Sequence, residues 1–171
     1  PGDNFFEYLY ANQNDVISVP GWAQGTVYYQ IFPERFFNGD GRNDPDSCME
    51  WGTPPTRENY MGGDLEGIRQ KIPYLRRLGI ECLYLNPIFE GDFNHKYATT
   101  DYFRIDPIFG TNETFRALVE DCHGAGIRVV LDGVFNHTGI HFPPFQDLLE
   151  KQERSEYREW FLVNSYPVAV T

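Results

Sequence analysis

Basic side chains are scarce in this sequence of 171 residues. Lysine and arginine together number 14, against 25 aspartate and glutamate residues, so the formal net charge is −11. Proteins that bind the phosphate backbone need a basic surface, and this composition therefore argues against a nucleic-acid partner. An acidic chain in which 16 % of the residues are aromatic suits a neutral, ring-shaped ligand better.

The sequence has only three cysteines, Cys48, Cys82 and Cys122. Their number and spacing fit neither a disulfide framework nor a metal site, and we expect the last two to pack as small apolar groups. No apolar run is long enough to cross a bilayer, and no secretory signal is visible, so we expect no membrane partner and a cytoplasmic location. The chain opens with Pro1 rather than Met, which leads us to expect a piece of a longer protein whose own signal would be missing.

Two common catalytic signatures are also missing. None of the serines at 18, 47, 155 and 165 lies in a nucleophile elbow, and no glycine-rich phosphate loop follows an expected strand. A flavodoxin-like binding domain would carry such a loop after Phe32, where this chain instead has an acidic loop.

Three apolar segments typical of buried strands alternate with two segments of helical spacing. The expected strands cover 26–32, 80–85 and 127–131, and the expected helices cover 65–78 and a segment that starts at 111 or 112 and stops at 124–126. Asp64 suits the N-cap of the first helix and Gly79 the position after its end, whereas Pro73 should kink it. Short links between buried strands predict parallel, right-handed βαβ units. A further helix is expected around 145–161.

The third expected strand ends in a group of polar residues, Asp132, Asn136 and His137. In α/β folds, chemistry lies at the carboxyl ends of buried strands. A carboxylate there can accept a sugar hydroxyl, and an imidazole can donate a hydrogen bond that strengthens as charge develops. A plain polar turn explains the same residues, and both interpretations stay open.

A second candidate group, His95-Lys96-Tyr97, lies on an expected long loop over 94–106. If this loop opens at the same edge, Tyr97 can present its flat ring to the apolar face of a sugar. An aromatic side chain that merely anchors a long loop is the alternative.

A third group consists of oxygen-bearing side chains and glycines. Its members are Asn38, Asp40, Asn43, Asp44, Gly62 and Asp64. Calcium takes oxygen ligands from carboxylates, amides and backbone carbonyls, usually about six to eight of them. The spacing is equally compatible with a calcium site and with a solvated turn.

Taken together, these motifs resemble the α-amylase family of glycoside hydrolases, within its neopullulanase, cyclomaltodextrinase and maltogenic amylase branch. The resemblance rests on Asp132–His137, His95–Tyr97 with Thr100–Tyr102, Tyr28–Phe36, Asn38–Asp40 and Gly62–Leu65, and it runs from about Trp22 to about Phe161. It implies an α/β fold, a partial TIM (β/α)8 barrel comprising the first three βα units and the start of the domain inserted after the third strand. Residues 1–22 would then lead in from a preceding domain, 23–138 would belong to the barrel, and 139–171 would begin the inserted domain B.

The resemblance also implies roles for individual residues. His137 would hydrogen-bond the sugar in the −1 subsite, Tyr97 would stack beneath that sugar, and His95 would line the subsite. Asp132 would hold the family's active-site arginine. A structural calcium would be bound by Asn38, Asp40, Asn43, Asp44, Asp64 and the Gly62 carbonyl. In typical amylases the residue matching Asn136 also binds calcium, but that second site is usually lost in this branch.

The implied activity is retaining cleavage of α-1,4, and sometimes α-1,6, glucosidic bonds in an α-glucan oligosaccharide. Retaining chemistry needs two paired carboxylates, which the family carries on later strands, so we expect no catalytic residue within this chain. The alternative is a sugar-binding module without catalysis. We also expect self-association through exposed strand edges, since three strands cannot close a barrel.

Overall fold

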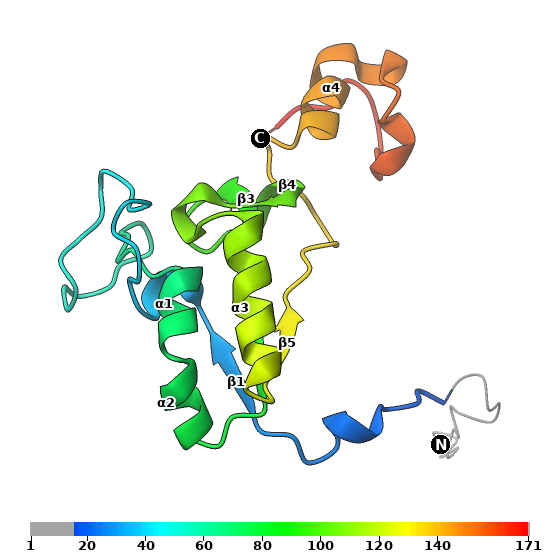
Figure 1. Ribbon diagram of the computed structural model, residues 1–171. Coiled ribbons are helices and arrows are strands. Elements are labelled where there is room, and N and C mark those ends of the chain that lie inside the picture. The colour runs from blue at the N-terminus through cyan, green and yellow to red at the C-terminus, as the bar shows by residue number, and fades with distance from the viewer. Residues whose placement is uncertain (1–15, 171) are drawn as a thin grey trace, which may run out of the picture.

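The computed structural model describes residues 16–170 (Figure 1). In chain order its strands and helices are β1 (Tyr28–Ile31), α1 (Leu65–Gln70), α2 (Ile72–Arg77), β2 (Cys82–Leu85), β3 (Phe89–Asp92), β4 (Ala98–Ile105), α3 (Asn112–Gly124), β5 (Arg128–Leu131) and α4 (Pro143–Lys151). Most of the expected lead-in over 1–22 lies outside the described residues. Among those residues, no helix is both long and apolar enough to cross a membrane.

Strands β1, β2 and β5 form one parallel sheet, in that order. The register aligns Ile31 with Leu85 and Leu85 with Leu131, so the three strands end at the same level. The connections between them run through α1 and α2 and then through α3, as expected from the alternation of segments. This is a parallel βαβ arrangement, in which loops that follow the strands gather at one edge.

The helices α1, α2 and α3 cover one face of this sheet (Figure 1). Alternate strand residues point toward them, and Ile31, Leu83 and Leu85 are at most 1 % exposed. They pack in one apolar cluster with helix residues such as Leu65 and Leu118. Because side chains alternate across a strand, Gln30, Tyr84 and Val130, which are aligned in register, belong to the opposite face.

The expected helix over 65–78 forms as two short helices, and the interruption falls at Lys71 rather than as a kink at Pro73. Asp64 caps α1 as predicted, since its carboxylate accepts the N–H of Gly67 at 2.6 Å. Lys71 separates α1 from α2, and Pro73 occupies the first turn of α2. Proline lacks an N–H and its ring crowds the preceding turn, so it is tolerated at a helix start but not in a helix interior.

The expected loop over 94–106 contains a strand instead. Strands β3 and β4 form an antiparallel hairpin with a register irregularity near Glu90. The reversal between them uses Phe93 and Lys96 at positive φ, 63° and 58°, rather than glycine. Sequence patterns miss this hairpin because neither residue is a usual left-handed turn former.

The expected helix around 145–161 is also too long. Helix α4 ends at Lys151, and short 3-10 turns follow it. Phe145 and Phe161 do pack together, with ring centroids 5.3 Å apart, but through a chain reversal rather than along one helix. Figure 1 shows α4 and these turns displaced from the sheet, at the end where β3 and β4 lie.

Candidate functional site

The carboxyl ends of β1, β2 and β5 bring polar residues to one edge of the sheet. Asn86 follows β2 and donates its backbone N–H to Ile31 O at 2.9 Å. Asp132 follows β5 and donates its N–H to Leu85 O at the same distance. Gln30 Nε2 donates a hydrogen bond to Asn86 Oδ1 at 2.8 Å. Asp132 is therefore fixed at the level where the sheet stops.

Tyr97 and Asp132 form the centre of the site. The Tyr97 hydroxyl donates a hydrogen bond to Asp132 Oδ2 at 2.6 Å, although the two residues are 35 positions apart. Burial, reinforced by the Asp132 carboxylate, raises the pKa of Tyr97 to about 12. The hydroxyl is consequently a protonated donor throughout the neutral range.

Tyr84 is a further member of this cluster that sequence reasoning missed. Burial, and then the charge of Asp132, raise the pKa of the Tyr84 hydroxyl. An aromatic residue inside a buried strand looks like core filling. The usable signal was the alternation of β2, which sends Tyr84 to the opposite face from Leu83 and Leu85.

His137 and His95 both contact the backbone of Tyr97. His137 Nε2 lies 3.1 Å from Tyr97 O, and since a carbonyl only accepts, this nitrogen carries the proton. His95 Nδ1 accepts the Tyr97 N–H at 3.0 Å, so in the neutral ring Nε2 bears the hydrogen. Burial and then Lys96 lower the pKa of His95, which favours that neutral form. The structure thus brings together all four expected substrate-binding residues, His95, Tyr97, Asp132 and His137.

A buried ion pair holds the loop that carries His95 and Tyr97. Lys96 Nζ lies 2.7 Å from Asp106 Oδ2 and donates to Gly91 O at 2.9 Å. Both side chains are nearly inaccessible, at 5 % and 6 % exposure. Lys96, read from the sequence only as the middle of a motif, therefore positions its two neighbours.

The loop after β5 is fastened to β4. Tyr102 donates its hydroxyl hydrogen to Val134 O at 2.6 Å. The hydroxyl oxygen of Tyr102 also lies 3.2 Å from His137 O. The Gly139 N–H donates to Thr99 O at 2.7 Å. These contacts fix the backbone of His137 relative to the hairpin.

The candidate calcium residues form a second, separate cluster. Asn38 Nδ2 donates to both carboxylate oxygens of Asp44, at 2.7 and 2.9 Å. Gly62, at φ +74°, packs so closely against both that a Cβ there would clash with them. Glu34, fully buried, accepts the N–H of Gly62 at 3.1 Å and fixes its position. Burial raises the pKa of Glu34, and sequence reasoning had given this residue no role.

The other three candidates are differently engaged. The Asp64 carboxylate accepts four N–H groups, including Asp40 N at 2.9 Å and Asn43 Nδ2 at 3.1 Å, besides those of Gly67 and Gly39. Burial raises the pKa of Asp64. Asp40 is paired with Arg42, whose hydrogen bonds lower the Asp40 pKa to about 2.

Two features of this cluster fit a bound cation. Asn43 Oδ1 is buried without a hydrogen-bond partner, and Asp44 Oδ1 lies beside Gly62. An all-oxygen donor set suits calcium. Within residues 16–170, no group of three or more His, Cys, Asp or Glu side chains is arranged for a metal, so amide and carbonyl oxygens would have to complete the ligand set.

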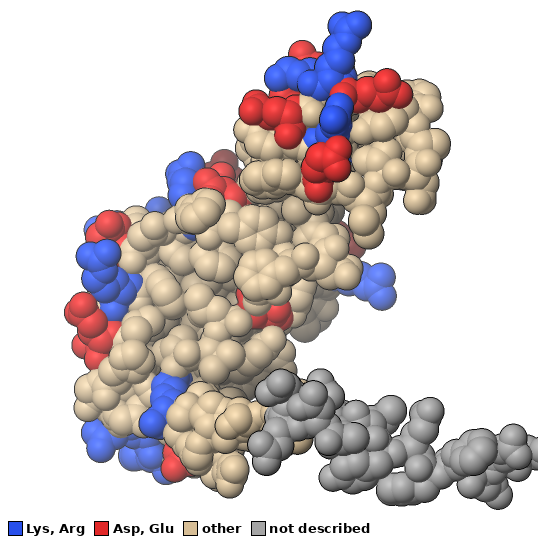
Figure 2. Space-filling view, turned by 90° about the vertical axis from the view of Figure 1, so that its right-hand side faces the viewer, with Lys and Arg blue, Asp and Glu red and all other residues tan. Residues whose placement is uncertain are grey.

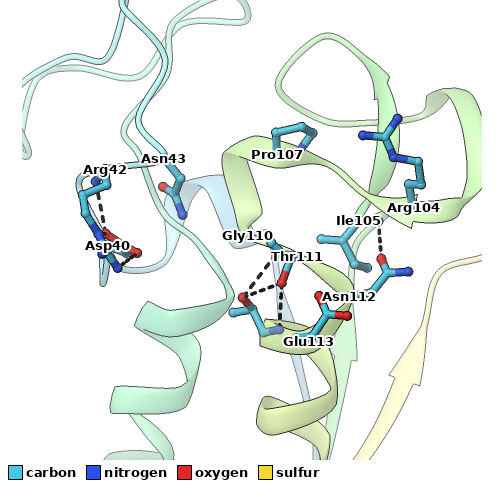
Figure 3. A pocket seen from close by; sticks show the side chains of 11 residues that line it. Asp40, Arg42, Asn43, Arg104, Ile105, Pro107, Gly110, Thr111, Asn112 and Glu113 are labelled. Carbon is cyan, nitrogen blue, oxygen red and sulfur yellow. Dashed lines mark hydrogen bonds and ion pairs between the residues drawn. The ribbon is translucent and has the colours of Figure 1, made fainter.

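A pocket of about 680 Å³ beside this cluster is shown in Figure 3. Its polar groups are mostly satisfied within the protein. Asp40 pairs with Arg42, Thr111 and Thr114 cap each other at the start of α3, and Asn112 accepts the N–H of Ile105 at 2.9 Å. The sugar-binding candidates do not line this pocket.

Residues 30–168 match the family description "Alpha amylase, catalytic domain". The chain belongs to the α-amylase family. It is 50 % identical over 167 residues to the maltogenic alpha-amylase of Bacillus acidopullulyticus, covering 97 % of this chain and 28 % of that protein. It is 46 % identical over 168 residues to neopullulanase 2 of Thermoactinomyces vulgaris, covering 97 % and 29 %.

Solved structures agree with this assignment. The cyclic alpha-maltosyl-(1→6)-maltose hydrolase from Arthrobacter globiformis superposes with a TM-score of 0.84 at 47 % identity, covering 89 % of this chain and 35 % of that one. Membership in a family of TIM-barrel hydrolases, predicted from the motifs, is confirmed. The chain spans less than a third of the length of the two curated relatives just named.

Proposed function

We propose that this chain is part of a retaining glycoside hydrolase that cleaves α-1,4, and in some substrates α-1,6, glucosidic bonds of maltodextrin, cyclodextrin, pullulan or starch. The observation that carries the proposal is the Tyr97–Asp132–His137 cluster at the carboxyl ends of parallel strands. The relatives' names, maltogenic alpha-amylase, cyclomaltodextrinase and neopullulanase, support this substrate class. A Bacillus subtilis relative named intracellular maltogenic amylase supports a cytoplasmic location.

In this proposal the residues of the cluster bind and orient one glucose unit. His95 Nε2–H, directed by the bond that its other nitrogen accepts, donates to a sugar hydroxyl. His137 Nδ1 accepts from a hydroxyl, because its Nε2–H is committed to Tyr97 O. The Tyr97 ring stacks on the apolar face of the sugar. Asp132 keeps Oδ1 for the family's arginine or a hydroxyl, since Oδ2 is held by Tyr97.

We assign neither nucleophile nor acid/base to these residues. Retaining hydrolysis needs two carboxyl groups about 5–5.5 Å apart, one to attack the anomeric carbon and one to protonate the leaving oxygen. Asp132 is instead paired with a tyrosine hydroxyl. We place the covalent step on carboxylates of the full-length enzyme outside the present chain.

We further propose that the second cluster binds a structural calcium ion. Asn38, Asn43, Asp44 and the Gly62 carbonyl would supply its central ligands, with Asp40 and Asp64 completing the set. The unpartnered Asn43 Oδ1 supports this assignment. When bound, the ion would neutralise clustered carboxylates and cross-link the loop to the start of α1.

Replacing His137 in the full-length protein tests the proposed function. With maltodextrin or β-cyclodextrin, His137→Ala should lower kcat more than it raises KM, because its interaction with the sugar strengthens in the transition state. His123→Ala, a change at an exposed position on α3, is the matched control and should leave both constants unchanged.

Product stereochemistry supplies an independent readout. The first anomer released, followed by NMR, should keep the α configuration of the substrate. A full-length protein that binds maltodextrin without hydrolysing it would support the sugar-binding module instead. First-formed β anomer would rule out the retaining mechanism.

A further inference from the structure

Phe93 stands out in the turn of the β3–β4 hairpin. Its φ is 63°, a left-handed conformation that is rare for a bulky residue, and its side chain is 63 % exposed. An exposed apolar ring gains little from folding, so packing does not explain why this residue occupies a strained position. Strain of this kind gathers at functional sites.

The neighbours of Phe93 hold it in place. Asn94 is 4 % exposed and donates through Nδ2 to Arg57 O at 2.9 Å and to Asn59 O at 2.8 Å. On the other side of the turn, Lys96 is anchored in the buried ion pair with Asp106. The ring of Phe93 is therefore presented from a fixed backbone.

Phe93 continues a row of rings that begins at the proposed sugar site. Its ring stacks on His95, with centroids 5.4 Å apart and planes at 21°. His95 in turn lies 5.8 Å from the ring of Tyr97, which contacts Asp132. The row leads away from Tyr97 in two steps of similar length.

A cavity of about 700 Å³ adjoins the outer end of this row. Its lining includes the aromatic side chains of Phe32, Tyr60 and Phe93, together with the side of His95. Arg57 and Glu58, both exposed, add charged hydrogen-bonding groups. Apolar faces with a few polar groups are typical of small-ligand sites, and sugars combine apolar C–H faces with hydroxyls.

We propose that Phe93 is a substrate-contacting residue that stacks on an outer glucose unit of the same glucan, beyond the units that lie around Tyr97. The inference rests on the proposed function. We assign the occupant of the cavity to the same glucan molecule, because His95 lines both the cavity and the proposed sugar site at Tyr97. The protein thereby favours α-glucans long enough to reach the cavity over short ones.

The test compares maltotriose with maltoheptaose in the full-length protein. Phe93→Asn removes the ring but suits the left-handed backbone, so the turn is preserved. A lost stacking contact of about 0.5–1.5 kcal/mol corresponds to a rise in KM of about 2- to 12-fold, and we expect it for maltoheptaose but not for maltotriose. Phe93→Trp should keep the wild-type KM for both substrates. Neither Phe93 variant should change kcat for maltotriose or maltoheptaose.

Phe103→Asn is the control, because Phe103 is 88 % exposed on β4 and lines a different pocket. It should leave the KM of both substrates unchanged. A Phe93→Asn effect equal at both chain lengths, or one confined to kcat, would overturn the inference and leave the proposed function intact. A wild-type protein that turns over neither substrate would overturn both.

Discussion

A single hydroxyl group joins two segments of the candidate site. Tyr97 comes from the hairpin after β2 and Asp132 from the end of β5, and their contact is 2.6 Å long. This hydrogen bond joins the two segments from side chain to side chain, whereas the other contacts between them that are described above involve a backbone group. Its loss should affect orientation of the sugar more than the stability of the fold.

Tyr97→Phe should therefore lower kcat/KM by about 10- to 150-fold, since a hydrogen bond to a charged partner contributes about 1.5–3 kcal/mol. The ring remains for stacking, so KM should change less than kcat. Tyr84→Phe is a comparison with a second hydroxyl near Asp132 and should have a smaller effect. An unchanged kcat in Tyr97→Phe would show that this bond does not serve catalysis.

The pH dependence of this bond follows from the raised pKa of Tyr97. Because the folded value is about 12 and the ordinary value is 10, the stabilising contribution is complete below pH 10 and is lost as pH rises toward 12. Tyrosinate absorbance should show one or more tyrosines that resist ionisation until beyond pH 10. Tyr97→Phe should remove the latest step of that titration.

At the scale of elements, the β3–β4 hairpin depends on one buried ion pair. Lys96→Met keeps the length of the side chain but leaves the Asp106 carboxylate buried without its cation. Breaking a buried pair in this way costs about 3–5 kcal/mol of unfolding free energy, measured by urea denaturation of the full-length protein. Arg104→Met, which removes a more exposed pair with Glu90 at 3.3 Å, should cost less than about 1 kcal/mol. An equal loss of unfolding free energy in the two variants would show that the Lys96–Asp106 pair does not hold the hairpin in place.

The loop that precedes α1 provides the calcium test. Calcium should raise the melting temperature of the full-length protein and a chelator should lower it, because an ion that binds only the folded state stabilises it. Asn43→Ala should reduce this shift, whereas Asn164→Ala, at an exposed position near the end of the chain, should not. A melting temperature indifferent to both additions, with no heat of binding, would refute the site.

The four residues chosen from the motifs lie together in the structure, whereas the elements that carry them were predicted less well. His95, Tyr97, Asp132 and His137 converge because parallel strands end at one edge, which the pattern of apolar segments implies. The hairpin escaped prediction since its turn is built from Phe93 and Lys96 instead of glycine. Contacts such as Tyr102 to Val134 O join residues 32 positions apart and leave no local signal.

At the scale of the whole molecule, the described sheet has β2 in the middle, so β1 and β5 each pair along one side only. Figure 2 shows charged side chains gathered over the region of α4, above a broad surface with few charges. Unpaired strand edges and a surface with few charges both favour association.

Residues 1–171 on their own should consequently self-associate. They should also release no reducing sugar from maltodextrin, because we place the catalytic carboxylates outside this chain. Light scattering measures the first expectation and a reducing-sugar assay the second. A monodisperse monomer would refute the association. Turnover that disappears in His137→Ala would show that a carboxylate of this chain, such as Asp132, is catalytic.

The bond between Gly139 and Thr99 links the α4 segment to the hairpin that bears His95 and Tyr97. A side chain at Gly139 would collide with the backbone at Ala98 and Thr99. The segment that continues into α4 therefore packs directly against the β3–β4 hairpin at this glycine. A residue larger than glycine at position 139 would have to move the start of the α4 segment away from the hairpin.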